Sequence, residues 1–111
     1  MSQEKQPDKK TDKELWGLIP KKIARKEYSI TVHARERQKD RNILDIDVLD
    51  ILENKPRRKR KRNKSKDKYI EGYEDWNYCI EGCDLDGEKI RLVISFDKNL
   101  MLVITVVRLN N

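Results

Sequence analysis

The only histidine of the chain, His33, is followed by Arg37 and Arg41 at steps of four residues. On a helix these side chains lie along one face, so an imidazole and two permanent cations can surround one anionic group. A metal-independent ribonuclease needs such groups, because it must move protons and hold a negatively charged phosphorane. We therefore interpret His33, Arg37 and Arg41 as candidate catalytic residues.

Each of these residues also has a structural interpretation. A histidine near the start of a helix often hydrogen-bonds a nearby carbonyl or carboxylate, and arginines on a helix surface pair with neighbouring acids. Three residues on strands complete the candidate set. Arg91 is a further catalytic cation, Arg108 a nucleic-acid-binding cation, and Tyr78 a ring that can stack on a base. Strand arginines facing water and a tyrosine in the core are the ordinary alternatives.

A dense basic segment, residues 55–68, is the second informative feature. It holds ten basic residues and one acidic residue, Asp67, whereas the whole chain has a formal net charge of +6, so the remainder is slightly acidic. Such a segment can displace counterions from a phosphate backbone, and a solvated, flexible connection is the alternative. The cations that we expect to bind nucleic acid here are Lys55, Arg57, Arg58, Lys59, Arg60, Lys61, Arg62 and Lys64.

Local signals predict how the chain begins. Residues 1–10 are polar and predict a disordered tail. Thr11 and Glu14 form a T-x-x-E capping box, which predicts a helical extension over residues 11–27. Pro20 leaves two possibilities open, one bent helix or two short ones.

The candidate catalytic residues fall in the next part of the chain. Residues 28–31 predict a short edge strand, and Thr31 is placed to cap a helix that runs to about Arg41. A second helix begins with acidic residues at Asp45 and ends at residues 54–56. We expect its apolar face to be formed by Ile46, Leu49 or Val48, and Leu52.

The second half of the chain predicts a three-strand meander. Strands are expected over residues 69–83, 90–96 and 100–107, joined by an Asp-Gly turn before the second and by residues 97–99 before the third. The last strand is apolar enough to be buried on both faces, with a sheet open on one face as the alternative. The sequence thus predicts an α+β fold, with helices packed on one face of a small antiparallel sheet, in a single domain over residues 28–111.

Composition limits the remaining classes of function. No stretch reaches the length of a membrane-spanning helix, and the start lacks the apolar core of a secretory signal, so we expect a cytoplasmic protein without membrane contact. Cys79 and Cys83 lack enough further soft ligands for zinc, and the four glycines form neither a P-loop nor a dinucleotide fingerprint. We therefore expect no metal and no small-molecule cofactor.

Residues 30–43, with the pattern T-x-H-A-x-x-R-x-x-x-R-x-I, resemble the opening of a small bacterial family catalogued as a domain of unknown function. The resemblance covers about residues 28–109. It implies a β-α-α-β-β-β domain similar to RelE-like and BrnT-like toxins, many of which cut RNA when released from an antitoxin. The chain departs from the family pattern at Leu44, where a Ser or Thr cap is common, and in its unusually basic residues 55–68.

Two principal hypotheses follow. The first is a toxin-like, metal-independent ribonuclease of a toxin–antitoxin type system, with His33 at its centre, RNA as substrate and an acidic antitoxin protein as partner. The second is a non-catalytic module that binds nucleic acid or an acidic protein through the basic segment. A relative that keeps the fold without an activity is a third.

Overall fold

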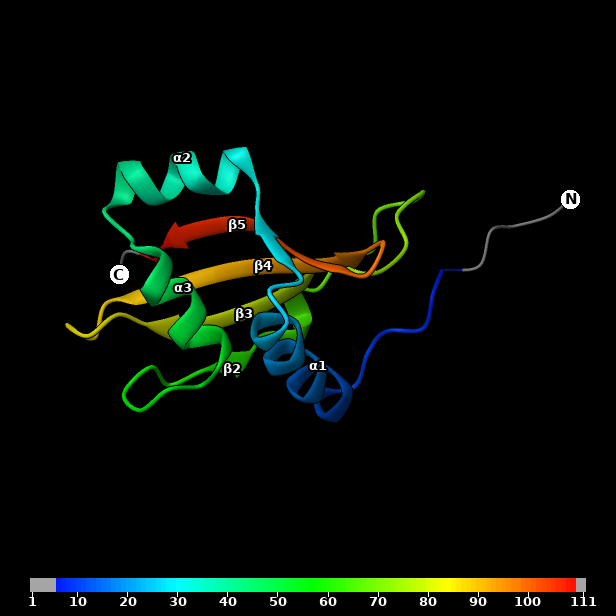
Figure 1. Ribbon diagram of the computed structural model, residues 1–111, viewed down its shortest axis with the longest axis horizontal. Coiled ribbons are helices and arrows are strands. Elements are labelled where there is room, and N and C mark those ends of the chain that lie inside the picture. The colour runs from blue at the N-terminus through cyan, green and yellow to red at the C-terminus, as the bar shows by residue number, and fades with distance from the viewer. Residues whose placement is uncertain (1–5, 110–111) are drawn as a thin grey trace, which may run out of the picture.

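The computed structural model describes residues 6–109 (Figure 1). Within them the chain forms three α-helices and one five-stranded sheet, which confirms the α+β class. The elements are α1 (Asp12–Ala24), β1 (Tyr28–Ile30), α2 (Val32–Arg41), α3 (Asp45–Leu52), β2 (Lys61–Arg62), a 3-10 turn (Lys64–Lys66), β3 (Tyr78–Cys83), β4 (Lys89–Asp97) and β5 (Leu100–Arg108).

The first helix, α1, begins where the capping box predicts. The Thr11 hydroxyl accepts from the Glu14 amide at 3.1 Å, and the Glu14 carboxylate accepts from the Thr11 amide at 2.9 Å. Pro20 lies within one continuous helix, so the interpretation as two short helices is wrong. Leu15 and Ile19 are fully buried and dock α1 onto the core.

The segment before α1 contacts the domain. The indole Nε1 of Trp76 donates to the Pro7 carbonyl at 2.8 Å, and the Lys10 ammonium lies 2.9 Å from a carboxylate oxygen of Asp75. The Lys10 amide also donates to the Tyr78 hydroxyl at 3.0 Å. Residues 7–10 therefore differ from the disordered tail expected over residues 1–10, of which residues 1–5 lie outside the described part.

The two middle helices have the expected bounds. The Thr31 hydroxyl accepts from the Ala34 amide at 3.2 Å at the start of α2, and Asn42 ends it in the left-handed conformation. Leu44 gives α3 no side-chain cap; the Asp47 carboxylate accepts from the Leu44 amide instead, at 3.0 Å.

The buried face of α3 is only partly as predicted. Val48 and Leu52 are fully buried as expected, but Ile51 is the third core residue and Ile46 is 55% exposed. Ile46 therefore lies on the solvent side of α3, whereas Val48, two residues later, faces the core.

The sheet has the order β1-β5-β4-β3-β2. Strands β3, β4 and β5 form the expected antiparallel meander, and β2, which was not predicted from the sequence, pairs antiparallel with β3. β1 runs parallel to β5, so the sheet is mixed and not antiparallel throughout as expected. β1 pairs only with residues 101–103, and α2 runs beside the remainder of β5 (Figure 1). Most of residues 69–77, expected to be strand, forms a loop joined to the sheet by one bridge between Lys68 and Asn77.

One face of the sheet carries the core. Side chains of β3, β4 and β5 on this face pack against α1 and α3, which lie in front of the strands in Figure 1. The other face has half-buried residues, among them Arg91, Val93 and Thr105. β5 is therefore buried on one face, and the expectation that it is buried on both is wrong. We call the second face the open face.

A glycine of β3 tests the packing of this edge. A Cβ on Gly82 would lie 2.6 Å from Ile51 Cγ2 and 2.8 Å from the Arg58 carbonyl oxygen, so Gly82→Ala should lower the free energy of unfolding by about 1–3 kcal/mol. Gly17→Ala, which meets nothing within 4 Å inside α1, should raise it by about 0.5–1 kcal/mol. Urea unfolding of both variants measures this. Equal stability of Gly82→Ala and the wild type would contradict the close approach of residue 58 to β3.

Candidate nucleic-acid interface

The basic segment follows the free edge of β3, with left-handed backbone at Arg57 and Lys59 and a short strand at residues 61–62. The Cys83 amide donates to the Arg58 carbonyl at 2.8 Å, the Asn63 amide donates to the Cys79 carbonyl at 2.9 Å, and β2 pairs with β3 between these bonds. The contacts of its side chains show that they alternate between the two faces of the sheet. Arg58, Arg60 and Arg62 accordingly turn toward the helices, and Lys59 and Lys61 toward the open face.

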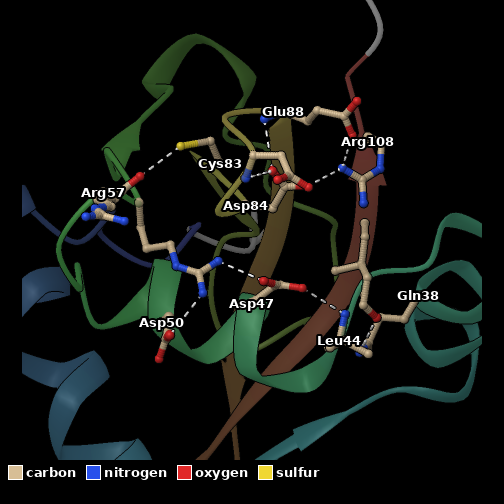
Figure 2. A network of polar contacts seen from close by, with 12 residues as sticks. Gln38, Leu44, Asp47, Asp50, Arg57, Cys83, Asp84, Glu88 and Arg108 are labelled. Atoms are coloured by element: carbon tan, nitrogen blue, oxygen red, sulfur yellow. Dashed lines mark hydrogen bonds and ion pairs between the residues drawn. The ribbon is translucent and has the colours of Figure 1, made fainter.

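Arg58 is a deeply buried cation of the segment, with 2% of its surface exposed. Its guanidinium donates to Asp47 at 2.8 Å and to Asp50 at 3.1 Å, both on α3 (Figure 2). Burial acts to lower the pKa of Arg58, but the hydrogen bonds and charges of Asp47 and Asp50 outweigh it and raise that pKa. Arg58 thus fastens the segment to α3 and is closed to a phosphate.

Arg60 and Arg62 fasten the segment to α1. The Arg60 guanidinium lies 3.8 Å from the ring centroid of Trp16 and donates to the Leu52 carbonyl at 2.8 Å. The Arg62 side chain is 2% exposed and binds Asp12 and Asp67 at 2.8 and 2.9 Å. A planar, weakly hydrated guanidinium tolerates such burial. The expectation that Arg58, Arg60 and Arg62 bind nucleic acid is therefore corrected, because all three hold the fold together.

Two hollows lie on the open face, and both have cationic linings. The Cys83 hollow, of about 300 Å³, is lined by Lys59, Lys61, Glu81, Gly82, Cys83, Gly87 and Lys89. The Cys79 hollow, of about 370 Å³, is lined by Lys66, Lys68, Asn77, Cys79, Arg91, Val93 and Thr105. Together these linings hold six cations and one carboxylate.

The carboxylate, Glu81, lies between the two hollows. Its Oε2 accepts from Asn63 at 3.1 Å and from Arg91 at 3.0 Å, and the Lys61 ammonium is 3.8 Å from its Oε1. Burial acts to raise the pKa of Glu81, but the hydrogen bonds from Asn63 and Arg91 and the charges of Arg91 and Lys61 outweigh it, so this pKa lies below its usual value. Glu81 is therefore a charged group at neutral pH and fixes the position of Arg91.

Tyr78 and Arg108 have structural contacts instead of the nucleic-acid contacts expected. Tyr78 is fully buried and donates to Asp75 at 2.6 Å, so its ring cannot stack on a base; burial, with this hydrogen bond, raises the pKa of its hydroxyl. Arg108 binds Asp84 and Glu88, each at 2.7 Å, and fixes the turn between β3 and β4 (Figure 2).

The candidate catalytic residues do not form one site. His33, Arg37 and Arg41 are exposed on α2 as predicted, and the His33 side chain is 92% exposed with its Nδ1 3.8 Å from Glu36 Oε2. Arg91 lies on β4 instead and is paired with Glu81, so the four candidates are divided between a helix and a strand.

The remaining predicted cations of the basic segment, Lys55, Arg57 and Lys64, are exposed. Sequence reasoning missed Glu81 and Lys89 and did not foresee that Arg91 pairs with Glu81. It counted Lys66 and Lys68 in the basic segment without naming them among the binding cations. A signal was present in the alternation of arginine and lysine over residues 58–62, which is the period of an edge strand.

Comparison with known proteins identifies the family. The family model described as Domain of unknown function (DUF4258) matches residues 30–108, so the chain belongs to that family, which agrees with the expectation of a family of unknown function. No curated protein and no solved structure matches the chain. In residues 6–109 no helix has the length and apolar character needed to cross a membrane, and no group of three or more His, Cys, Asp or Glu side chains could hold a metal ion.

Mutation of Arg58 tests whether its buried ion pairs hold the basic segment to α3. Arg58→Ala leaves two carboxylates of α3 without their cation and should lower the free energy of unfolding by about 2–3 kcal/mol. Arg57→Ala removes an exposed guanidinium from the preceding residue and should change the free energy of unfolding by less than about 0.5 kcal/mol. Urea unfolding at neutral pH distinguishes them. Equal losses in both variants would contradict the inward position of Arg58.

Proposed function

We propose that this DUF4258 domain binds RNA through the open face of its sheet. The observation that carries the proposal is the concentration of six cations around two hollows whose combined lining contains one carboxylate, Glu81. Cations placed in this way release counterions from a phosphate backbone when RNA binds, which gives both affinity and a strong dependence on salt.

The different positions of the arginines and lysines in the basic segment support this proposal. Three of its four arginines, Arg58, Arg60 and Arg62, bind carboxylates or a ring face of the domain itself, so the exposed lysines and Arg57 are the groups that can reach a ligand. Lys61 has a side chain that is 69% exposed, although Glu81 lies near it. An acidic protein, such as the antitoxin expected from the sequence, is the alternative partner, because its negative charge is attracted to the same lysines.

Neutralising the lysines of the open face tests the proposal. A variant with Lys59, Lys61, Lys66 and Lys68 replaced by alanine should bind a mixed-sequence RNA at least 100-fold more weakly than the wild type and with a flatter dependence on salt, because about four cations are lost. Fluorescence anisotropy over a series of salt concentrations measures both effects.

The matched control removes four exposed cations from α1 and the turn after it, Lys13, Lys21, Arg25 and Lys26. It should change the affinity less than fivefold, since α1 covers the opposite face of the sheet. An equal loss of RNA affinity in the two variants would mean that net charge alone attracts RNA, and would contradict the proposal that the open face is the binding surface.

RNA cleavage at α2, as in a toxin of a toxin–antitoxin system, is the second candidate function. One observation favours it: His33, Arg37 and Arg41 are all exposed on one helix, so a phosphate can reach an imidazole and two guanidinium groups. In this hypothesis the open face holds the RNA and His33 transfers the proton. No metal ion is required for such a step.

Expression in a bacterial host tests cleavage. The wild type should arrest growth and degrade total RNA, and His33→Ala should abolish both effects while it retains RNA affinity in vitro. Lys39→Ala, which removes another exposed side chain of α2, should behave as the wild type. Harmless expression of the wild type with intact RNA would reject the ribonuclease hypothesis and leave RNA binding to be judged by the anisotropy data.

A further inference from the structure

We propose that the Cys83 hollow and the Cys79 hollow are two separate phosphate subsites, and that one single strand of RNA crosses the ion pair of Glu81 and Arg91 to occupy both. The inference rests on the proposed RNA-binding function and specifies the class of RNA and its path. Three features of the open face carry it: the position of Glu81, the spacing of the hollows, and their apolar floor.

The carboxylate of Glu81 divides the cationic surface. It is held by Asn63 and Arg91, and the side chain is 11% exposed, so its charge stays between the hollows. A phosphate placed directly over this carboxylate would be repelled. Phosphates are therefore favoured on either side of it, where Lys59, Lys61 and Lys89 surround one hollow and Lys66, Lys68 and Arg91 the other.

The register of the sheet sets the distance between the subsites. Cys83 pairs with Lys89 in the first hollow, and Cys79 pairs with Val93 in the second. These positions are four residues apart along β3, which is about 13 Å at the rise of a strand. This separation exceeds that of neighbouring phosphates in one strand, so a ligand that reaches both subsites must carry at least three phosphates in a row.

The floor of the hollows favours an unpaired strand. Cys83 and Gly82 lie in one lining, and Cys79, Val93 and Thr105 in the other; both thiols are buried, whereas the lysines of the linings are exposed. Apolar surface under a cationic rim suits a base or a sugar that leaves the stack while its phosphates stay at the rim. A duplex keeps its bases paired and offers only its phosphates.

The Cys79 hollow is held in place before any ligand binds. Asp67, whose side chain is fully buried, accepts from the Cys79 amide at 2.8 Å and from two nitrogens of Arg62. Lys68 forms the bridge with Asn77 on the other side of Asp67. Because the backbone that carries Lys66 and Lys68 is fixed, less ordering is needed when a phosphate binds.

A length series of labelled oligouridylates, from two to eight nucleotides, tests the inference by fluorescence anisotropy. The affinity of the wild type should rise steeply, by about tenfold or more, at the length that first spans both subsites, because the second contact then becomes intramolecular. Lys59→Ala with Lys61→Ala, or Lys66→Ala with Lys68→Ala, should each remove this step and weaken binding of the longest oligomer by about tenfold. Lys13→Ala with Lys21→Ala, on α1, should keep the step.

Further arms separate failure of this inference from failure of the proposed function. A duplex of the same sequence should bind more weakly than the single strand. A smooth rise of affinity with length, or a duplex that binds as tightly, would overturn the two-subsite path while RNA binding stands. Binding of an acidic peptide with no binding of any oligonucleotide would overturn both. Circular dichroism and thermal unfolding of each double variant establish that its fold is intact.

Discussion

The pairing of Arg58 with Asp47 and Asp50 is the interaction on which the candidate interface depends. It ties the chain that follows α3 to the helix itself, and through the bond from the Cys83 amide to the Arg58 carbonyl it places that chain on the edge of β3. A segment with so much like charge would otherwise repel itself and remain solvated. Carboxylates on α3 and α1 bind its buried arginines and hold it at the edge of the sheet.

The two cationic residue types are used differently because their chemistry differs. A guanidinium can bind carboxylates in a planar geometry and stack on a ring while it loses water, and Arg60 against Trp16 shows both burial and stacking. An ammonium is more strongly hydrated and favours the surface. Alternation of the two along an extended chain therefore places the structural cations on one face and the available cations on the other.

Much of the fold could be predicted because its signals are local. The capping box of α1, Thr31 and Asn42 at the ends of α2, and the turns between β3, β4 and β5 depend on neighbouring residues only. The exceptions depend on distant partners. Tyr78 is buried because Asp75 and the Lys10 amide satisfy its hydroxyl, and β1 is parallel because it meets β5, which follows about 70 residues later.

The candidate site was harder to predict for the same reason. A row such as His33, Arg37 and Arg41 is visible in a sequence because helical spacing alone creates it. The open face combines residues of three separate segments, and the position of Glu81 among their cations becomes apparent only when the register of β2, β3 and β4 is known. Counting charges also overestimated the number of cations in the basic segment that are available to a ligand. A count cannot distinguish an arginine bound to Asp47 from a lysine that faces water.

Nitrogen-15 NMR of the wild type, titrated with a short oligouridylate, tests the central claim most directly because it reports every backbone amide in one experiment. We expect the largest shift changes at the amides of the open face, those of Lys61, Lys68, Cys79, Glu81 and Arg91, with α2 and α1 nearly unchanged. Changes confined to α2 around His33, with the amides of β3 and β4 unaffected, would contradict the account and transfer the RNA-binding site to the helix.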